Sequence, residues 1–558
     1  MTSRAAAPLL PAPDEPAPRT LLLRGGHVYS PADPFATAVL VQDGTVAWVG
    51  SESAADSYAR DADAVTDLAG ALVTPAFVDA HVHATSTGLA LTGLDLTGCP
   101  GLAEALDRIA AFVRAWPAGG VVVGHGWDET GWPERRAPSL AELDAACAGA
   151  AVYLSRTDVH SALASSALRA LADREQGAGG LAALPGHHPE QPLTRDAHHA
   201  VRAAALAHLT PAQRDTAQRA ALRRAAELGI GSVHECAGPG ISSEGDLTAL
   251  LELAGRGDGP EVFGYWGELG AVDTARRLGA VGAGGDLFVD GAIGSHTACL
   301  HAPYTDSADS ADEGARYLTA EQVADHVAAC TAAGLQAGFH AIGDAALAAV
   351  AQGVRAAAGK VGLGRVRALR HRVEHAELLD ADGIAAFAEL GLTASVQPAF
   401  DAAWGGTDGM YATRLGAGRA RAMNPFAALL RAGVPLAFGS DAPVTALDPW
   451  GTVRAAAFHR TAEHRISVRA AFTAHTRGGW RALGRDDAGT LVPGAPASYA
   501  VWAPTQLLVQ APDQRVANWS TDPRSGVPGL PELTPGGPDP RCLATVVRGR
   551  TVYLAEQG

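Results

Sequence analysis

A repeated alternation of helix and strand in the middle of the chain constrains its fold more than any other feature. Thr210-Pro211-Ala212-Gln213 predicts a helix start with a capping threonine, and Gly229 predicts the end of that helix before the strand "IGSVHEC". The same order returns when "EQVADHVAACTAAG" leads into "LQAGFHAIGD", "DGIAAFAELG" into "LTASVQPAF", and "NPFAALLRAG" into "VPLAFGSDAP". Apolar strands that alternate with helices indicate a parallel sheet covered on both faces. If the sheet closes into a barrel, functional residues gather at the carboxyl ends of its strands.

The two ends of the chain are rich in short strands instead. Near the N-terminus, "VQDGTV" predicts a hairpin because Asp-Gly suits the positive φ angles of a type I′ turn, and "ATVVRGRTVYLAE" repeats this style near the C-terminus. Ends this short seldom form a stable sheet alone, so we expect them to pair with each other. The predicted organisation is a disordered tail over 1–19, a composite β-sandwich from 20–73 and 488–558, and a barrel over 74–487 with an insertion at about 85–210.

Composition narrows the class of partner. The formal charge of -16 argues against nucleic acid and anionic membranes, because both require a basic face. The chain has no run of eighteen apolar residues, and its first twenty residues mix prolines with acids, so we expect a cytoplasmic protein without a membrane span or signal peptide. Its six cysteines are widely spaced and lack CxxC pairs, which favours reduced thiols over disulfides. We expect a small-molecule substrate and leave a homodimer open.

Histidines and an aspartate stand where the predicted strands end. In "FVDAHVHA", the two-residue period of a strand points Asp79, His81 and His83 to one side, so both imidazoles can reach one cation. His340 closes "LQAGFH", His375 follows "VRALRHRV", and Asp441 follows "PLAFGS". Four strands therefore deliver four histidines and one aspartate to one end of the barrel, a ligand set that suits zinc.

These segments resemble the amidohydrolase superfamily, in particular the subgroup that contains N-substituted formamide deformylase. The resemblance is carried by "VTPAFVDAHVHA", "GHGWDE", "SRTDVHSALASSAL", "LFVDGAIGSHTA", "FHAIGDAA", "HRVEHAE" and "FGSDAPV". It implies a metal-dependent (β/α)8 barrel with a composite β-sandwich. It also implies that His81 and His83 lie on the first strand, His340 on the fifth, His375 on the sixth and Asp441 on the eighth.

The sequence departs from this subgroup at the fourth strand. Where a carboxylated lysine usually bridges two metals, this chain has Asp286, and its single lysine, Lys360, lies in the predicted loop "AAAGKVGLG". A carboxylated lysine reaches roughly 7 Å from its Cα and an aspartate about 3 Å. We therefore expect one firmly held Zn²⁺, with a second ion completed by Asp286 or Glu235 as the alternative and Mn²⁺ or Fe²⁺ left open. Glu235 is equally consistent with a hydrogen-bonded structural acid.

Residues for substrate binding come from the resemblance alone. Trp127 and Asp128 in "GHGWDE", His160 in "RTDVHS" and His296 in "GAIGSHTA" lie in segments that resemble loops lining the pocket in the family. Packing within the insertion is an equal interpretation for Trp127. Many relatives have arginine at the position of His296, which weakens any specificity argued from it.

The predicted chemistry is hydrolysis of an amide-type C–N bond in a small, N-substituted amide. A bound divalent cation makes hydroxide available near neutral pH. Asp441 is the expected general base, and His375 either binds a second metal or donates a hydrogen bond to the oxyanion. Deamination of a heterocycle is the first alternative, although "HAIGD" lacks the HxxE glutamate of such deaminases. A non-catalytic scaffold is the second, although its ligands should have decayed.

Overall fold

The computed structural model describes residues 9–116, 119–157, 161–176, 179–510, 519–520 and 527–556. Its centre is a sheet of eight strands in which neighbours follow chain order and run parallel. The strands are β7 (Phe77–Val82), β13 (Ile230–Ala237), β14 (Glu261–Trp266), β15 (Gly282–Ala283), β16 (Gln336–Ala341), β17 (Arg372–His375), β18 (Thr393–Val396) and β19 (Leu436–Phe438). A bridge between Val82 and Ala442 joins the first strand to the segment after the last. The sheet is therefore a nearly closed barrel, which confirms the predicted fold class.

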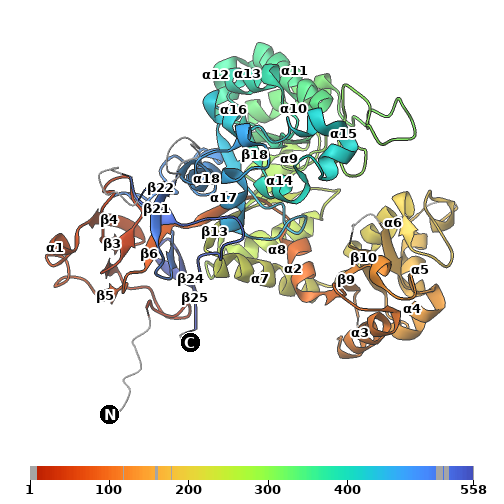
Figure 1. The fold of residues 1–558 in the computed structure, drawn as a ribbon, viewed down its shortest axis with the longest axis horizontal. Coiled ribbons are helices and arrows are strands. Elements are labelled where there is room, and N and C mark those ends of the chain that lie inside the picture. The colour runs from red at the N-terminus through yellow and green to blue at the C-terminus, as the bar shows by residue number, and fades with distance from the viewer. Residues whose placement is uncertain are drawn as a thin grey trace. The chain divides into compact units, whose positions relative to one another are not determined.

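Helices connect successive barrel strands, and three more follow the last of these strands (Figure 1). They are α7 (Pro211–Glu227), α8 (Glu244–Ala254), α9 (Val272–Arg277), α10 (Ala320–Ala333), α11 (Asp344–Val361), α12 (Leu363–Ala368), α13 (Ala381–Leu390), α14 (Pro398–Trp404), α15 (Met410–Ala420), α16 (Phe426–Arg431), α17 (Pro449–Ala457), α18 (Val468–Ala474) and α19 (Arg477–Ala482). The predicted start of α7 is confirmed, because the Gln213 amide donates to Thr210 Oγ1 at 3.2 Å and the helix begins at Pro211. Gly229, with φ +79°, then turns the chain into β13.

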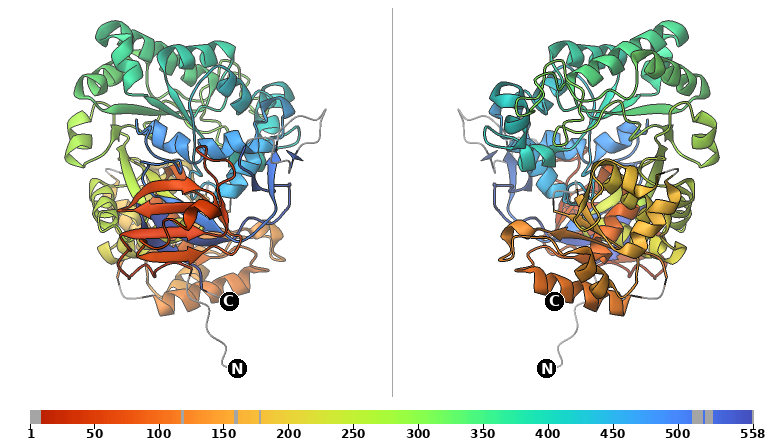
Figure 2. Two further views of the ribbon diagram at one scale, coloured as in Figure 1. Left: turned by 90° about the vertical axis from the view of Figure 1, so that its left-hand side faces the viewer. Right: turned by 90° about the vertical axis from the view of Figure 1, so that its right-hand side faces the viewer.

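Strands from both ends of the chain form two small sheets that share one core. The first sheet contains β1 (Thr20–Arg24), β3 (Ala38–Gln42), β4 (Thr45–Gly50) and β5 (Ala64–Asp67), and α1 (Glu52–Ala55) packs on it. The second contains β2 (His27–Val28), β6 (Leu72–Pro75), β20 (Tyr499–Trp502), β24 (Cys542–Val547) and β25 (Arg550–Leu554). In this second sheet, β6 from the N-terminal part pairs antiparallel with β20 from the C-terminal part, so strands from both ends lie side by side (Figure 2). The predicted hairpin is confirmed by Asp43 and Gly44, with φ +49° and +73°.

Other parts of the predicted organisation lie partly outside this description. Of the predicted tail, residues 1–8 are outside the described residues, whereas Leu9 and Leu10 pack against the shared core of the two sheets. A third small sheet joins β21 (Leu507–Gln510), β22 (Trp519–Ser520) and β23 (Leu530–Pro531). All six cysteines carry free thiols, as predicted. In the described part of the chain, no helix has both the length and the apolar character that a membrane crossing requires.

Residues Ala84–Ala221 form a separate compact unit. Its sheet contains β8 (Leu94–Asp95), β9 (Val122–Trp127), β10 (Val152–Arg156), β11 (Ser161–Ala164) and β12 (Leu193–Thr194). Its helices are α2 (Ala84–Thr92), α3 (Leu102–Ala115), α4 (Leu140–Cys147), α5 (Ser166–Glu175), α6 (Arg195–Ala207) and the first part of α7, with short 3-10 turns at Glu129–Gly131 and Leu181–Ala183. Apolar side chains on each face of this sheet form the two cores of the unit. The predicted insertion corresponds to this unit, and the exact domain boundaries stay a prediction.

Gly88 provides a test of packing within this unit. A Cβ placed on Gly88 in α2 would lie 1.8 Å from the Ala217 carbonyl oxygen in α7, so Gly88→Ala must push the two helices apart. We expect a loss of about 1–3 kcal/mol in the free energy of unfolding. The control is Gly359→Ala in α11, where no atom lies within 4 Å, and which should gain about 0.5–1 kcal/mol. Thermal unfolding of both variants measures the difference, and equal midpoints would contradict the close approach.

His371 predicts how stability depends on pH. Burial lowers its pKa from 6.5 to about 4, and its Nδ1 accepts the Ala337 amide at 2.8 Å, which requires a neutral ring. The imidazole of His371 binds a proton more tightly in the unfolded chain than in the folded one. Its contribution to the free energy of unfolding is therefore fully present above pH 6.5 and decreases as the pH drops toward 4. Chemical denaturation measures the free energy of unfolding near pH 7 and near pH 5. The decrease between these two pH values should be about 2 kcal/mol smaller in His371→Gln than in the parent. An unchanged pH dependence would show that another group governs acid stability.

Candidate metal centre

The carboxyl ends of the barrel strands bring two histidines and two aspartates together. His83 Nε2 lies 3.1 Å from Asp441 Oδ1 and 3.2 Å from Asp286 Oδ2. His81 Nε2 lies 3.5 Å from both Asp286 Oδ1 and Asp441 Oδ1. Two ligands held about 2.1 Å from one zinc ion at a tetrahedral angle lie about 3.4 Å apart. The observed spacing is therefore that of ligands around a cation.

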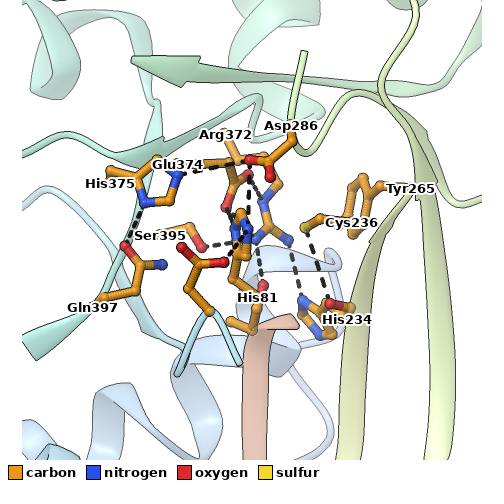
Figure 3. Close-up of polar contacts among 12 residues, drawn as sticks. His81, His234, Cys236, Tyr265, Asp286, Arg372, Glu374, His375, Ser395 and Gln397 are labelled. Atoms are coloured by element: carbon orange, nitrogen blue, oxygen red, sulfur yellow. Dashed lines mark hydrogen bonds and ion pairs between the residues drawn. The ribbon is translucent and has the colours of Figure 1, made fainter. Parts of the chain in front are cut away.

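His375 extends this group on the other side of Asp286. Its Nε2 lies 3.7 Å from Asp286 Oδ1, so the same carboxylate faces both His81 of β7 and His375 of β17 (Figure 3). Within the described residues, the triads His81–His83–Asp441 and His81–Asp286–His375 each hold three ligand atoms within 4.8 Å of one another. Four of the predicted site residues and the predicted alternative Asp286 thus converge.

The converging atoms lack hydrogen-bond partners although they are buried. This holds within the described chain for His81 Nε2, His375 Nε2, Asp286 Oδ1 and Asp441 Oδ1. Buried polar atoms are nearly always paired, and an unpaired group calls for an explanation such as an ion. Imidazole nitrogens and carboxylate oxygens are zinc ligands, so the residues present fit a divalent cation.

Each converging histidine is oriented through its other ring nitrogen. His81 Nδ1 lies 2.9 Å from Glu374 Oε2, and His83 Nδ1 lies 3.1 Å from the Cys236 carbonyl oxygen. His375 Nδ1 lies 2.8 Å from Gln397 Oε1. Since each partner atom is an acceptor, Nδ1 donates and Nε2 keeps its lone pair for a ligand, the arrangement typical of metal-binding histidines.

Charge in this region favours a cation. Burial alone would lower the pKa of His83, but the carboxylates of Asp286 and Asp441 outweigh burial and raise this pKa to about 10. Burial alone would raise the pKa of the Glu374 carboxyl. The guanidinium of Arg372 and the imidazole of His81 outweigh burial and lower this pKa to about 2. The two aspartates therefore hold a place where a positive charge, whether a proton or a metal ion, is stabilised.

Asp286 reaches the centre because the backbone before it lies unusually close to the neighbouring strand. A Cβ on Gly284 would lie 2.1 Å from the Gly338 amide nitrogen, and Gly285 adopts φ +82°. The two glycines allow an approach that a side chain would block. Asp286, the predicted alternative ligand, thus lies among the converging side chains, and its role as a bridge between two ions stays a prediction. Lys360 lies in the last turn of α11 and bonds Asp325 at 2.7 Å, so the predicted loop there is wrong.

Asp441 is fixed by the segment that closes the barrel. Its amide donates to the His81 carbonyl oxygen at 2.8 Å, and the preceding Ser440 amide donates to Asp79 Oδ1 at 2.9 Å. Asp79 therefore anchors the closing segment instead of joining the ligands. Asp441 and His375 both adopt positive φ, +56° and +70°, which is uncommon for residues other than glycine and concentrates at functional sites.

His340 and Glu235 are less directly placed. The His340 ring centroid lies 4.4 Å from that of His375, and its unpartnered Nδ1 lies 3.6 Å from Asp290 Oδ1. Glu235 is buried on β13. Neither residue belongs to a triad of ligand atoms among the described residues, so their roles as ligands stay predictions.

The predicted substrate residues have structural partners of their own. Trp127 is 1% exposed in a core of its unit and donates from Nε1 to the Leu154 carbonyl, which favours the packing interpretation. Asp128 accepts from the Thr130 amide at 3.0 Å and pairs with Arg156. His160 lies outside the described residues.

His296 is bound within its own loop. Its ring nitrogens face Asp306 at 3.0 Å and Asp312 at 3.3 Å, and its ring stacks on Tyr304 with centroids 4.4 Å apart. These contacts hold the loop together. A role of His296 in substrate binding stays a prediction.

Sequence reasoning missed the buried residues behind the centre. Arg372 on β17 contacts Glu374, donates to the Ala80 carbonyl and donates to Ser395 Oγ at 2.7 Å. Cys236 Sγ forms a third group of potential ligands with His81 and Glu374. The signal was available in "RVEH", because two charged residues on alternate positions of a buried strand must both face the barrel interior.

The fold and this cluster define the class of barrel enzymes with a histidine and aspartate metal centre. The pattern described as "Amidohydrolase family" matches residues 64–553, and the chain belongs to this family.

Known relatives are distant. The chain is 27% identical to Protein LONG AFTER FAR-RED 3 of Arabidopsis thaliana over 526 residues, 86% of each chain. It is 26% identical to N-substituted formamide deformylase of Arthrobacter pascens over 446 residues, 74% of this chain and 78% of the deformylase. A solved structure of an uncharacterized metal-dependent hydrolase from Pyrococcus furiosus is 25% identical, with a TM-score of 0.72 over 86% of this chain and 98% of the other. At this distance, membership of the deformylase subgroup stays a proposal.

Proposed function

We propose that the protein is a metal-dependent hydrolase that cleaves an amide-type C–N bond in a small, N-substituted amide. The observation that carries this proposal is the convergence of unpartnered imidazole nitrogens and carboxylate oxygens at the carboxyl end of the barrel. Family membership supports the reaction class, and the similarity to a formamide deformylase supports an amide substrate.

His81, His83, His375, Asp286 and Asp441 would hold the ion, and His340 lies beside His375, where a second ion could be bound. When bound, a divalent cation such as Zn²⁺ lowers the pKa of water to about 7 and polarises a carbonyl group. The Asp441 carboxylate takes the proton of the attacking water and passes it to the leaving nitrogen. Asp79 and the Ser440 amide keep that carboxylate in place throughout.

Aromatic rings beside the centre support an apolar substituent on the substrate. The Phe400 ring lies parallel to His375 with centroids 5.9 Å apart, and Phe288 lies 4.6 Å from His340. Trp404, which is partly exposed, packs on Phe400 at 4.7 Å. These aromatic rings favour a neutral, apolar or aromatic substituent on the substrate over a charged one.

The structure offers less support for deamination. Asp344, the acid nearest to the HxxE position, accepts the His301 amide at 2.9 Å and the Ala345 amide at 2.9 Å. A carboxylate occupied by two backbone amides is poorly placed to move protons on a substrate.

Metal content combined with a substrate panel tests the proposed function. We expect at least one zinc per purified chain by elemental analysis, and hydrolysis of N-benzylformamide or formanilide that a chelator removes and zinc restores. Reconstitution with Mn²⁺ and Fe²⁺ tests the native metal, and two ions per chain would favour the alternative of a second ion completed by Asp286 or Glu235. A chain that binds no metal and hydrolyses no amide after metal addition would be a scaffold.

A further inference from the structure

Gln397 contacts His375 of the metal centre and still has an unused donor. It lies at the end of β18, is 1% exposed, and its Oε1 accepts the Nδ1–H of His375 at 2.8 Å. Its Nε2 is buried and has no hydrogen-bond partner among the described residues. In Figure 3, the amide nitrogen of Gln397 is turned away from His375 and toward the side on which His81 lies.

The contact with His375 fixes which end of the amide faces the ring. His375 Nε2 faces Asp286, and it serves as a ligand only if the ring proton is on Nδ1. The Nδ1–H must then meet an acceptor, so Oε1 faces the ring and the NH₂ group must lie on the opposite side. The orientation of the histidine therefore determines that of the glutamine.

An unpaired, buried NH₂ group has an energetic cost. Leaving such a donor unsatisfied destabilises the site, and an acceptor arriving there would remove this cost. A substrate amide presents a carbonyl oxygen, an acceptor whose negative charge grows as water attacks the carbon. A neutral donor already in place stabilises that charge without reorganisation.

We propose that Gln397 has two roles: a positioning residue that holds His375 with Nε2 toward the metal, and a hydrogen-bond donor to the carbonyl oxygen of the substrate. The second role rests on the proposed amide hydrolysis and the first does not. Together they predict a carbonyl compound, with the acyl oxygen on the β18 side of the centre.

Two substitutions separate the roles. Gln397→Glu keeps an acceptor for His375 but removes the donor, whereas Gln397→Met removes both at similar size. Both variants of the full chain are compared with the parent for thermal midpoint, for zinc affinity by chelator competition, and for kcat and KM with N-benzylformamide.

We expect Gln397→Glu to bind zinc at least as tightly as the parent and to lose about 10²- to 10³-fold in kcat with little change in KM, because the donor acts mainly in the transition state. Gln397→Met should in addition bind zinc about 10- to 100-fold more weakly. Parent-like zinc affinity in Gln397→Met overturns the positioning role, and parent-like kcat in Gln397→Glu overturns the donor role.

The two hypotheses fail in different ways. If the parent chain binds zinc but hydrolyses no amide in the panel, the proposed function fails and the donor role falls with it. The zinc comparison still decides the positioning role. If Gln397→Met does not fold, the zinc affinity of Gln397→Asn, whose shorter amide cannot reach His375 from the same backbone position, replaces it with the same expected loss.

Discussion

Replacement of Asp441 by asparagine should lower kcat about 10³-fold, the largest loss we expect for a change of so few atoms. Asparagine keeps the size of the side chain and its Oδ1, but it cannot accept and return a proton. The carboxylate also faces His81 and His83 directly, so part of the loss reflects weaker metal binding. Measuring kcat at saturating zinc, together with zinc content, separates the two effects.

The matched control for this prediction is Asp344→Asn. Asp344 is another aspartate on the same side of the barrel, but its carboxylate accepts backbone amides of His301 and Ala345. An asparagine oxygen can replace most of these bonds, so kcat should change less than about 3-fold. Parent-like activity of Asp441→Asn at full zinc occupancy would exclude Asp441 as the base.

Replacement of Arg372 by methionine should destabilise the protein by about 3–5 kcal/mol. Arg372 and Glu374 are both completely buried, and removing the guanidinium leaves the Glu374 carboxylate without its charged partner and with only the hydrogen bond from His81 Nδ1 among the described residues. The control is Arg355→Met, whose partner is Glu389 and whose side chain is 52% exposed, so the loss there should be at most about 1 kcal/mol. Denaturant unfolding measures both values.

A double variant distinguishes the structural role of the pair from its role at the centre. Arg372→Met combined with Glu374→Leu removes both buried charges and should recover most of the lost stability. His81 would still lose the acceptor for its Nδ1, so zinc affinity should stay about 10- to 100-fold below that of the parent. Recovery of zinc affinity along with stability would contradict the role of Glu374 in orienting His81.

The fold and the side chains that converge on the centre were predictable for a physical reason. In parallel βα units, strand ends lie at one edge, so His81, His83, His375 and Asp441 could be placed together from their positions after apolar runs. The rule that parallel strands end at one edge is enough to predict that these four side chains lie close together.

Asp286 and Gln397 could not be placed in the same way. The reach of Asp286 depends on how closely Gly284 and Gly285 pack against β16, which is a property of neighbouring strands and not of the local sequence. Gln397 becomes visible only when one knows which nitrogen of His375 faces inward. The local sequence around Trp127 could not distinguish a core residue from a pocket residue, because an apolar ring with one donor fits both. In the structure, Trp127 packs in the core of its own unit.

The contact between Asp441 and His81 also dictates when the protein can become active during its synthesis. The bond from the Asp441 amide to the His81 carbonyl oxygen and the bridge between Val82 and Ala442 join the first strand of the barrel to the segment after the last, so His81 and His83 lack Asp441 until that segment has left the ribosome. We therefore expect a nascent chain to bind a divalent cation only weakly before this point, and truncation before residue 441 to leave the barrel open along one side and to abolish activity.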